Sequence, residues 1–289
     1  MSVAVAAWAA VIVLGVVGVA VLAYGIAVEP FQLTRTDVDV RVPDLPPALD
    51  GYTIAVLSDM HCGGGIATPA SFVRRAFDVA QRAAPDLVAL VGDYSVSTRR
   101  TPRLNARWYA RGMREVGPMI RALRAPDGIV GVLGNHDHFY DAAVVRAWLE
   151  ELGVRALVNE SVVIERDGAA LVVGGVDDFM EGHVDPAGGC DGRPPDAPTV
   201  VLAHNPDSVL LLTAPRRVDL VLSGHTHGGQ VVLPLVGALA RQASICTRHA
   251  TSGWVPNARA PLYVSRGIGG QHPPRVNCRP EVVIVRLRA

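Results

Sequence analysis

The stretch Thr53-Ile-Ala-Val-Leu-Ser-Asp-Met-His61 joins a short apolar run to two side chains that commonly bind metal ions. The run from Thr53 to Leu57 is short, apolar and β-branched, and it predicts a strand of a layered α/β domain. Asp59 and His61 then lie just beyond the carboxyl end of the strand, where α/β proteins bind ligands.

Comparable apolar runs recur along the chain and predict six further strands, at 87–91, 129–133, 171–176, 199–203, 220–222 and 282–287. Amphipathic stretches that open near Pro, Asp or Asn predict helices at 69–84, 104–123, 141–152 and 206–212. The segment 181–198 is rich in Gly, Pro and Asp and is predicted to be a loop. Strands that alternate with helices are the pattern of a layered α/β domain.

Polar side chains follow five of the predicted strands within a residue or two. They occur as Asp59-Met60-His61, Gly92-Asp93, Gly134-Asn135-His136-Asp137, His204-Asn205 and Gly224-His225-Thr226-His227. The carboxyl ends of strands in an open α/β sheet meet at the edge where ligands bind. We therefore expect these side chains to gather at one site.

The predicted cluster combines carboxylate, amide and imidazole ligands. Mixed oxygen and nitrogen donors suit borderline divalent ions such as Mn, Fe or Zn better than Ca. One carboxylate can bridge two such ions about 3.5 to 4 Å apart, and a bridging hydroxide can then attack a phosphoryl group in line. The pattern predicts a hydrolytic site that needs no organic cofactor.

Composition excludes several other classes of protein. The 289 residues carry 27 basic and 27 acidic side chains, so no global charge indicates nucleic-acid binding, and we expect no nucleic-acid partner. Every basic side chain is arginine, which excludes lysine chemistry of the Schiff-base and Walker types, and no HExxH helix indicates a metalloprotease. The four cysteines lack the close pairs of a zinc finger, and they are Cys62, Cys190, Cys246 and Cys278. We expect free thiols, with one disulfide as the alternative if the domain is exported.

The N-terminus is a long uncharged apolar run. Residues 2–28 carry no charged side chain and would span roughly 40 Å as a helix, against a hydrocarbon core of about 30 Å. A cleavable signal peptide would need a basic start and an apolar region of about 7 to 15 residues. We therefore expect a transmembrane anchor over 1–28, an extended tether over 29–50 because of its prolines, and a catalytic domain over 51–289.

From about Thr53 onward, the five ordered motifs resemble the signature of the calcineurin-like metallophosphoesterases. Further runs resemble the membrane-associated bacterial branch of that family typified by YaeI and YkuE; they are His204-Asn205-Pro206-Asp207, Gly228-Gly229-Gln230 and Asn277-Cys278-Arg279-Pro280-Glu281. The resemblance implies a four-layer α/β/β/α sandwich behind the N-terminal transmembrane helix.

The resemblance also implies a role for each site residue. Asp59, His61 and His227 would bind a first metal ion, and Asp93 would bridge it to a second. The second ion would be held by Asn135, His204 and His225. His136 would be the histidine that is not a ligand and that acts on the transition state or the leaving oxygen.

One position departs from the family pattern. Phosphoprotein phosphatases of this superfamily place an Asp three residues after the bridging carboxylate to orient the catalytic histidine, whereas this chain has Val96 there. Another group must therefore orient His136, and Asp137 is the nearest candidate in the sequence.

The function implied by the resemblance is hydrolysis of a phosphodiester or pyrophosphate bond by two divalent metal ions, with manganese expected and iron or zinc as alternatives. The anchor favours a lipid-linked or envelope substrate. The resemblance to YaeI and YkuE implies the outer face of the cytoplasmic membrane. The competing interpretation is a membrane-tethered binding protein that keeps the fold without turnover. The oligomeric state is left open.

Overall fold

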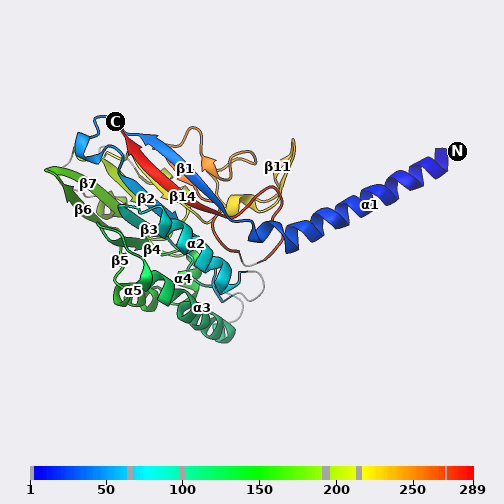
Figure 1. The fold of residues 1–289 in the computed structure, drawn as a ribbon, viewed down its shortest axis with the longest axis horizontal. Helices are drawn as coiled ribbons and strands as arrows, with labels where there is room; N and C mark the ends of the chain where they lie inside the picture. The colour runs from blue at the N-terminus through cyan, green and yellow to red at the C-terminus, as the bar shows by residue number, and fades with distance from the viewer. Residues whose placement is uncertain (1–2, 64–67, 98–101, 191–195, 213–216, 271) are drawn as a thin grey trace.

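A long N-terminal helix, α1 (Val3–Ala27), projects from one end of a layered α/β domain, and the C-terminus lies at the opposite end (Figure 1). The computed structural model describes residues 3–63, 68–97, 102–190, 196–212, 217–270 and 272–289. Residues 1–2 of the predicted anchor and the side chain of Cys190 lie outside this description. Cys62, Cys246 and Cys278 are buried free thiols.

The first of two six-stranded sheets contains both ends of the domain sequence. Its strands, in spatial order, are β1 (Thr34–Arg41), β14 (Glu281–Arg288), β2 (Thr53–Leu57), β3 (Leu87–Val91), β4 (Ile129–Val132) and β5 (Arg155–Ala156). Strands β2 to β5 run parallel, and β14 pairs antiparallel with β2. The carboxyl ends of β2, β3 and β4 therefore share one edge.

The second sheet packs face to face with the first. Its spatial order is β12 (Gly253–Trp254), β13 (Leu262–Val264), β9 (Leu220–Ser223), β8 (Thr199–Leu202), β7 (Ala169–Gly175) and β6 (Glu160–Arg166), and a small hairpin pairs β10 (Val232–Leu233) with β11 (Gly237–Ala238). Ile54 and Leu87 of the first sheet share a buried apolar cluster with Leu202 and Leu222 of the second. This interior fixes the two sheets against each other.

Outer layers complete the sandwich. The first sheet is covered by α2 (Ala70–Arg82), α3 (Pro102–Ala122), α4 (Asn135–Tyr140) and α5 (Ala142–Glu151). Phe72, Phe77 and Ile120 bury their side chains in this layer. The second sheet is covered by short elements, α6 (Pro186–Cys190) and the 3₁₀ helix η3 (Pro206–Leu210), with loops. The predicted layered α/β fold is confirmed, although 206–212 forms only a 3₁₀ turn and 181–198 contains α6.

The predicted tether over 29–50 is wrong. That segment holds the 3₁₀ helices η1 (Glu29–Phe31) and η2 (Pro47–Leu49), with β1 between them. Strand β1 pairs in parallel with β14 from Thr34 opposite Glu281 onward. Val38 and Val40 alternate with exposed residues and are buried between the sheets, a period-two pattern that outweighs the neighbouring prolines. The folded domain therefore begins near Glu29.

Helix α1 is apolar on every side and exposes almost all of its surface. The segment Ala7–Phe31 has a mean hydropathy of 2.7, and only 6% of its most apolar 18-residue stretch is buried. It is therefore a candidate membrane span. A core helix of a soluble domain would be buried instead. The length, composition and exposure of α1 together suggest a membrane anchor.

Candidate metal centre

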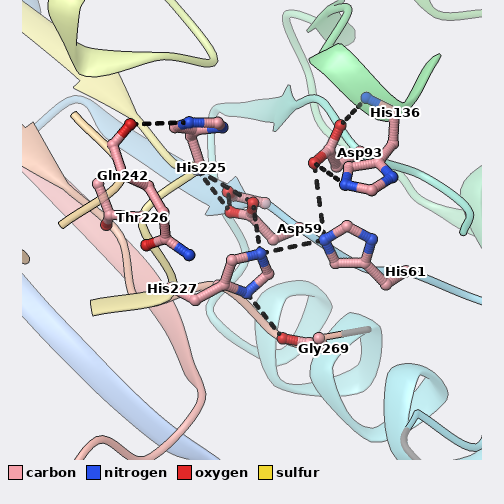
Figure 2. A network of polar contacts seen from close by, with 12 residues as sticks. Asp59, His61, Asp93, His136, His225, Thr226, His227, Gln242 and Gly269 are labelled. Atoms are coloured by element: carbon pink, nitrogen blue, oxygen red, sulfur yellow. Dashed lines mark hydrogen bonds and ion pairs between the residues drawn. The ribbon is translucent and has the colours of Figure 1, made fainter. Parts of the chain in front are cut away.

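The predicted site residues lie just beyond the ends of β2, β3, β4, β8 and β9. Figure 2 shows six of them in one network, and these are Asp59, His61, Asp93, His136, His225 and His227. Five of them adopt left-handed backbone angles, with positive φ at Asp59, His61, Asp93, His225 and His227. Non-glycine residues rarely adopt this conformation, and it concentrates at functional sites. The chain turns sharply after each strand, so that alternate side chains point into one cluster.

The glycines that precede the ligands allow this close approach. A Cβ atom at Gly92 would lie 2.7 Å from both the Gly134 nitrogen and His204 Nδ1. A Cβ atom at Gly224 would collide with the Asp59 carboxylate. The Gly-Asp and Gly-His pairs of the sequence are therefore required by packing around the ligands.

The first group consists of Asp59, His61 and His227. His61 Nε2 lies 3.1 Å from His227 Nε2, and His227 Nε2 lies 3.5 Å from Asp59 Oδ1. The backbone N–H of His225 donates to both oxygens of the Asp59 carboxylate, and the Ser58 hydroxyl also contacts it. Carboxylate and imidazole atoms that converge in this way form a three-ligand group with all members buried.

The second group consists of Asn135, His204 and His225. Asn135 Oδ1 lies 3.2 Å from His204 Nε2 and 3.0 Å from His225 Nδ1. The amide oxygen and two ring nitrogens thus face one another from β4, β8 and β9. His204 is fully buried, and Asn135 and His225 are nearly so.

Asp93 lies between the two groups. Its Oδ2 atom is 3.6 Å from His61 Nε2 on one side and 3.3 Å from His204 Nε2 on the other. Its Oδ1 atom accepts a hydrogen bond from the backbone N–H of His136 at 2.9 Å. One oxygen therefore faces members of both groups while the other fixes the carboxylate.

Backbone carbonyls hold three of the imidazoles by the nitrogen that faces away from the cluster. His204 Nδ1 contacts Val91 O at 2.8 Å, His227 Nδ1 contacts Gly269 O at 3.1 Å, and His225 Nε2 contacts Gln242 O at 3.2 Å. Each carbonyl favours a proton on the nitrogen it faces, which leaves the other nitrogen as a ligand. The sequence gives no signal for these partners, because any residue type supplies a carbonyl.

Burial and charge set the protonation states of the cluster. Burial lowers the pKa of His61 well below its usual range and lowers that of His227 to about 4. Burial would raise the pKa of Asp93, but the charges of His204 and His136 hold it well below its usual range. Burial opposes protonation of His204, yet the charge of Asp93 raises its pKa. His61 and His227 are therefore neutral beside an ionised Asp93, the states in which these groups bind metals, whereas His204 must release a proton before it can bind one.

The donor set fits divalent ions. The Gly269 carbonyl favours the proton of a neutral His227 ring on Nδ1, which leaves a lone pair on Nε2 that points toward His61 Nε2 at 3.1 Å. His61 Nδ1 is buried without a hydrogen-bond partner among the described residues. Buried lone pairs aimed at one another are costly unless a cation lies between them.

His136 lies at the rim of the cluster, on α4. Its Nδ1 atom contacts the Ser97 carbonyl at 2.7 Å, and its Nε2 atom lies 4.0 Å from Asp93 Oδ2. The side chain is 14% exposed, so its ring reaches both the cluster and solvent. The Ser97 carbonyl orients the ring from the segment that follows Asp93.

The expectation that Asp137 orients His136 is wrong. The Asp137 carboxylate points to the other side and accepts hydrogen bonds from the backbone N–H groups of Asp93, Tyr94 and Gly134. It also accepts from the Tyr109 hydroxyl. Asp137 therefore ties α4 to the end of β3, which positions Asp93 and Asn135 rather than the His136 ring.

A two-sheet sandwich whose strand ends carry two groups of buried oxygen and nitrogen donors around a shared aspartate defines a metallophosphoesterase. The family model of the calcineurin-like phosphoesterases matches residues 52–229, and the chain belongs to this family. It is a metal-dependent hydrolase that acts on phosphoric ester bonds.

Three relatives agree with this class. The metallophosphoesterase YkuE of Bacillus subtilis (strain 168) is 28% identical over 92% of this chain and 90% of its own length. Phosphodiesterase YaeI of Escherichia coli (strain K12) is 29% identical over 82% of each chain. The UDP-2,3-diacylglucosamine pyrophosphatase LpxG of Chlamydia muridarum (strain MoPn / Nigg) is 24% identical over 89% of this chain and 90% of its own. The expected resemblance to the YaeI and YkuE branch is confirmed.

Proposed function

We propose that this protein hydrolyses a phosphodiester or pyrophosphate bond with two divalent metal ions, at the outer surface of the cytoplasmic membrane that holds α1. The observation that carries the proposal is the position of Asp93 Oδ2 between the two groups of donors. A single carboxylate oxygen in that place suits a bridge between two cations.

The residues divide into two ligand sets. Asp59, His61 and His227 form the first, and the second is formed by Asn135, His204 and His225, with Asp93 shared. Divalent ions bound there would supply a water-derived nucleophile and neutralise charge on the phosphoryl oxygens. Mixed oxygen and imidazole donors suit manganese, iron or zinc, and we take manganese as the metal to test first.

His136 completes the site as the catalytic group. Its Nε2 atom lies 4.0 Å from Asp93 Oδ2, and its Nδ1 atom contacts Ser97 O at 2.7 Å. A ring held in this way can stabilise charge on the phosphoryl group or protonate the leaving oxygen.

The substrate class follows from the anchor and from the relatives. A membrane span places the metal centre next to lipids, which raises the effective concentration of any membrane-borne phosphoester. YaeI is named a phosphodiesterase, and LpxG is named a pyrophosphatase of a diacylated nucleotide sugar. The first name supports hydrolysis of a phosphodiester, and the second supports a lipid-linked pyrophosphate as the substrate of this chain.

The test is metal-dependent release of p-nitrophenol from bis(p-nitrophenyl) phosphate by the full-length protein. We expect activity with Mn²⁺, loss of activity with a chelator, and recovery when metal is restored. A metal-loaded protein that releases no p-nitrophenol, and that hydrolyses no member of a set of phospholipids and nucleotide sugars, would contradict the proposal.

A further inference from the structure

The base of helix α1 is built into the catalytic domain. Gly25 packs against the segment 274–276, where a Cβ atom would lie 2.8 Å from Arg275 O and Val276 Cγ2. The Arg275 N–H donates to Gly25 O at 2.8 Å. Four residues later, the buried Glu29 carboxylate accepts a hydrogen bond from the Cys278 N–H. The last turn of the candidate membrane span therefore has a fixed position relative to the metal centre.

A cavity of about 250 Å³ lies in the angle between the base of α1 and the loop that follows β13. Ile26, Pro30 and Phe31 line it from the helix side, and Ile268 and Pro273 line it from the loop. Ile26 is 45% exposed, so the cavity opens onto the same surface as the apolar side of α1. This end of the cavity is apolar and begins where the bilayer would end.

The other end of the cavity is polar and adjoins the metal centre. The Gly269 carbonyl in its wall is the partner of His227 Nδ1 at 3.1 Å, as Figure 2 shows. Arg275, which also lines the cavity, is 2% exposed and donates to Gly269 O at 2.6 Å. Its Nη2 atom lies 3.5 Å from His227 Nδ1.

The guanidinium of Arg275 is a buried cation without a matching carboxylate. Among the described residues, its polar contacts are the carbonyls of Arg266, Gly269 and Cys278, together with the Cys278 thiol and His227. Among the residues that the structure describes, no carboxylate lies within ion-pair distance of it. These carbonyls hold Arg275 behind the His227 ring, so the polar wall of the cavity supports that ring from the side that faces away from the metal centre.

The geometry points to a subsite for one hydrocarbon chain of a membrane phosphodiester. This inference rests on the function proposed above and names its substrate class. The apolar end takes part of the chain from the bilayer beside Ile26, and the phosphate lies outside the cavity, on the side of His227 where Nε2 faces the metal centre. The volume is below the about 300 to 1,000 Å³ of pockets for drug-sized ligands, so most of the chain stays in the membrane.

Two phosphodiester substrates that both release p-nitrophenol distinguish a defect in the subsite from a defect in the metal centre. Methyl p-nitrophenyl phosphate has no chain for the cavity, whereas dodecyl p-nitrophenyl phosphate inserts one. The full-length protein is assayed in phosphatidylcholine vesicles, with Ile26→Trp to fill the cavity from the exposed face of the helix. Val28→Trp is the matched control, since Val28 is 42% exposed at the same depth and does not line the cavity.

We expect Ile26→Trp to lower kcat/KM for the dodecyl ester at least about tenfold, because several methylenes lose their burial. The methyl ester should change by no more than about twofold in both variants, as for substitutions away from the reacting atoms. Equal losses on the two esters in Ile26→Trp, or an unchanged rate on the dodecyl ester, would overturn the subsite.

A second measurement does not depend on turnover. Phosphatidylglycerol with a diazirine in one acyl chain is mixed into the vesicles and photolysed, and the labelled peptides are mapped. We expect label on the peptide that contains Ile268 and Pro273, and its loss in Ile26→Trp. Label confined to α1 would overturn the inference. Failure of the wild-type protein to hydrolyse either ester would instead contradict the proposed function, while the label would still report on the cavity.

Discussion

Backbone strain at single residues is the local feature on which the metal centre depends. Asp59, His61 and Asp93 leave their strands with positive φ, at 51°, 43° and 56°. Each such residue costs of order 1 to 3 kcal/mol, which the surrounding packing must offset. A bound cation offsets it further, because it also neutralises the cluster of buried donors.

Replacement of Asp93 tests the shared carboxylate. Asp93→Ala should lose both metal ions, because both donor groups use the same oxygen. Wild-type protein at a Mn²⁺ concentration one hundred times Kd should gain about 2.7 kcal/mol of unfolding free energy per site, and the variant should gain almost none. Elemental analysis and urea unfolding measure the two effects. Exposed Asp78→Ala is the control, and two tightly bound ions in Asp93→Ala would exclude a bridge.

Replacement of His136 separates chemistry from metal retention. His136→Ala should lower turnover of bis(p-nitrophenyl) phosphate about 100- to 10,000-fold, the range for loss of a general acid or of electrostatic stabilisation. Both ions should remain bound, because the ring is not in either ligand set. Exposed His249→Ala should behave as wild type. Turnover within a factor of two of wild type would remove His136 from the mechanism.

Strand β1 shows how a single element alters the limits of the domain. It pairs with β14 across about 245 residues of sequence, and Val38, Val40 and Leu49 from this region are buried. Burial of each such side chain contributes about 1.5 to 3 kcal/mol. Their sum is comparable with the whole stability of a typical domain, about 5 to 15 kcal/mol.

Two truncations test this boundary. Deletion of residues 1–28 keeps β1 and should leave a folded protein that hydrolyses soluble esters. Deletion of residues 1–50 removes β1 and the buried valines, and it should give a protein without a cooperative unfolding transition. Circular dichroism during urea titration distinguishes them. Equal midpoints for the two truncations would show that β1 is dispensable.

An ion pair between α4 and the segment after β7 predicts a pH dependence of stability. His138 Nε2 lies 2.8 Å from Asp177 Oδ1. Burial opposes protonation of His138, but the hydrogen bond and charge of Asp177 raise its pKa above the usual value. Burial likewise raises the pKa of Asp177, but His138 and backbone N–H groups lower it overall.

The direction of the pH dependence of stability follows from the raised pKa of His138 and the lowered pKa of Asp177. The raised pKa of His138 gives stability that is complete below its unfolded value near 6.5 and is lost as the pH rises through the folded value. The lowered pKa of Asp177 gives stability that is present above about 3.9 and is lost in acid. His138→Gln should therefore destabilise the metal-loaded protein at pH 5.5 and have less effect at pH 9, as measured by urea unfolding. A difference that stays constant over this range would contradict the ion pair, and His249→Gln is the control.

Across the whole molecule, the sequence predicted those strands and site residues whose pattern lies within one short segment. Apolar runs followed by Asp59, Asp93, Asn135, His204 and His225 predicted both the strands and the edge where these side chains meet. The sequence did not predict contacts made by the backbone, such as Ser97 O with the catalytic ring, because a carbonyl has no residue type. It also missed the β1–β14 pair, because parallel partners so far apart leave only a weak local pattern.

The fixed base of α1 has a consequence for how this enzyme finds its substrate. On the anchorage proposed above, the hydrogen bonds of Gly25 and Glu29 to the segment 274–278 would hold the catalytic domain beside its own bilayer. The enzyme would then search the surface of that bilayer, and a neighbouring membrane would lie out of its reach. Vesicles that carry both the enzyme and a non-exchanging long-chain diester should therefore turn over at least about ten times faster than a mixture of enzyme-only and substrate-only vesicles. Equal rates in the two experiments would mean that the catalytic domain reaches substrate in a neighbouring membrane. The expected difference would mean that each enzyme molecule hydrolyses only substrate in its own membrane.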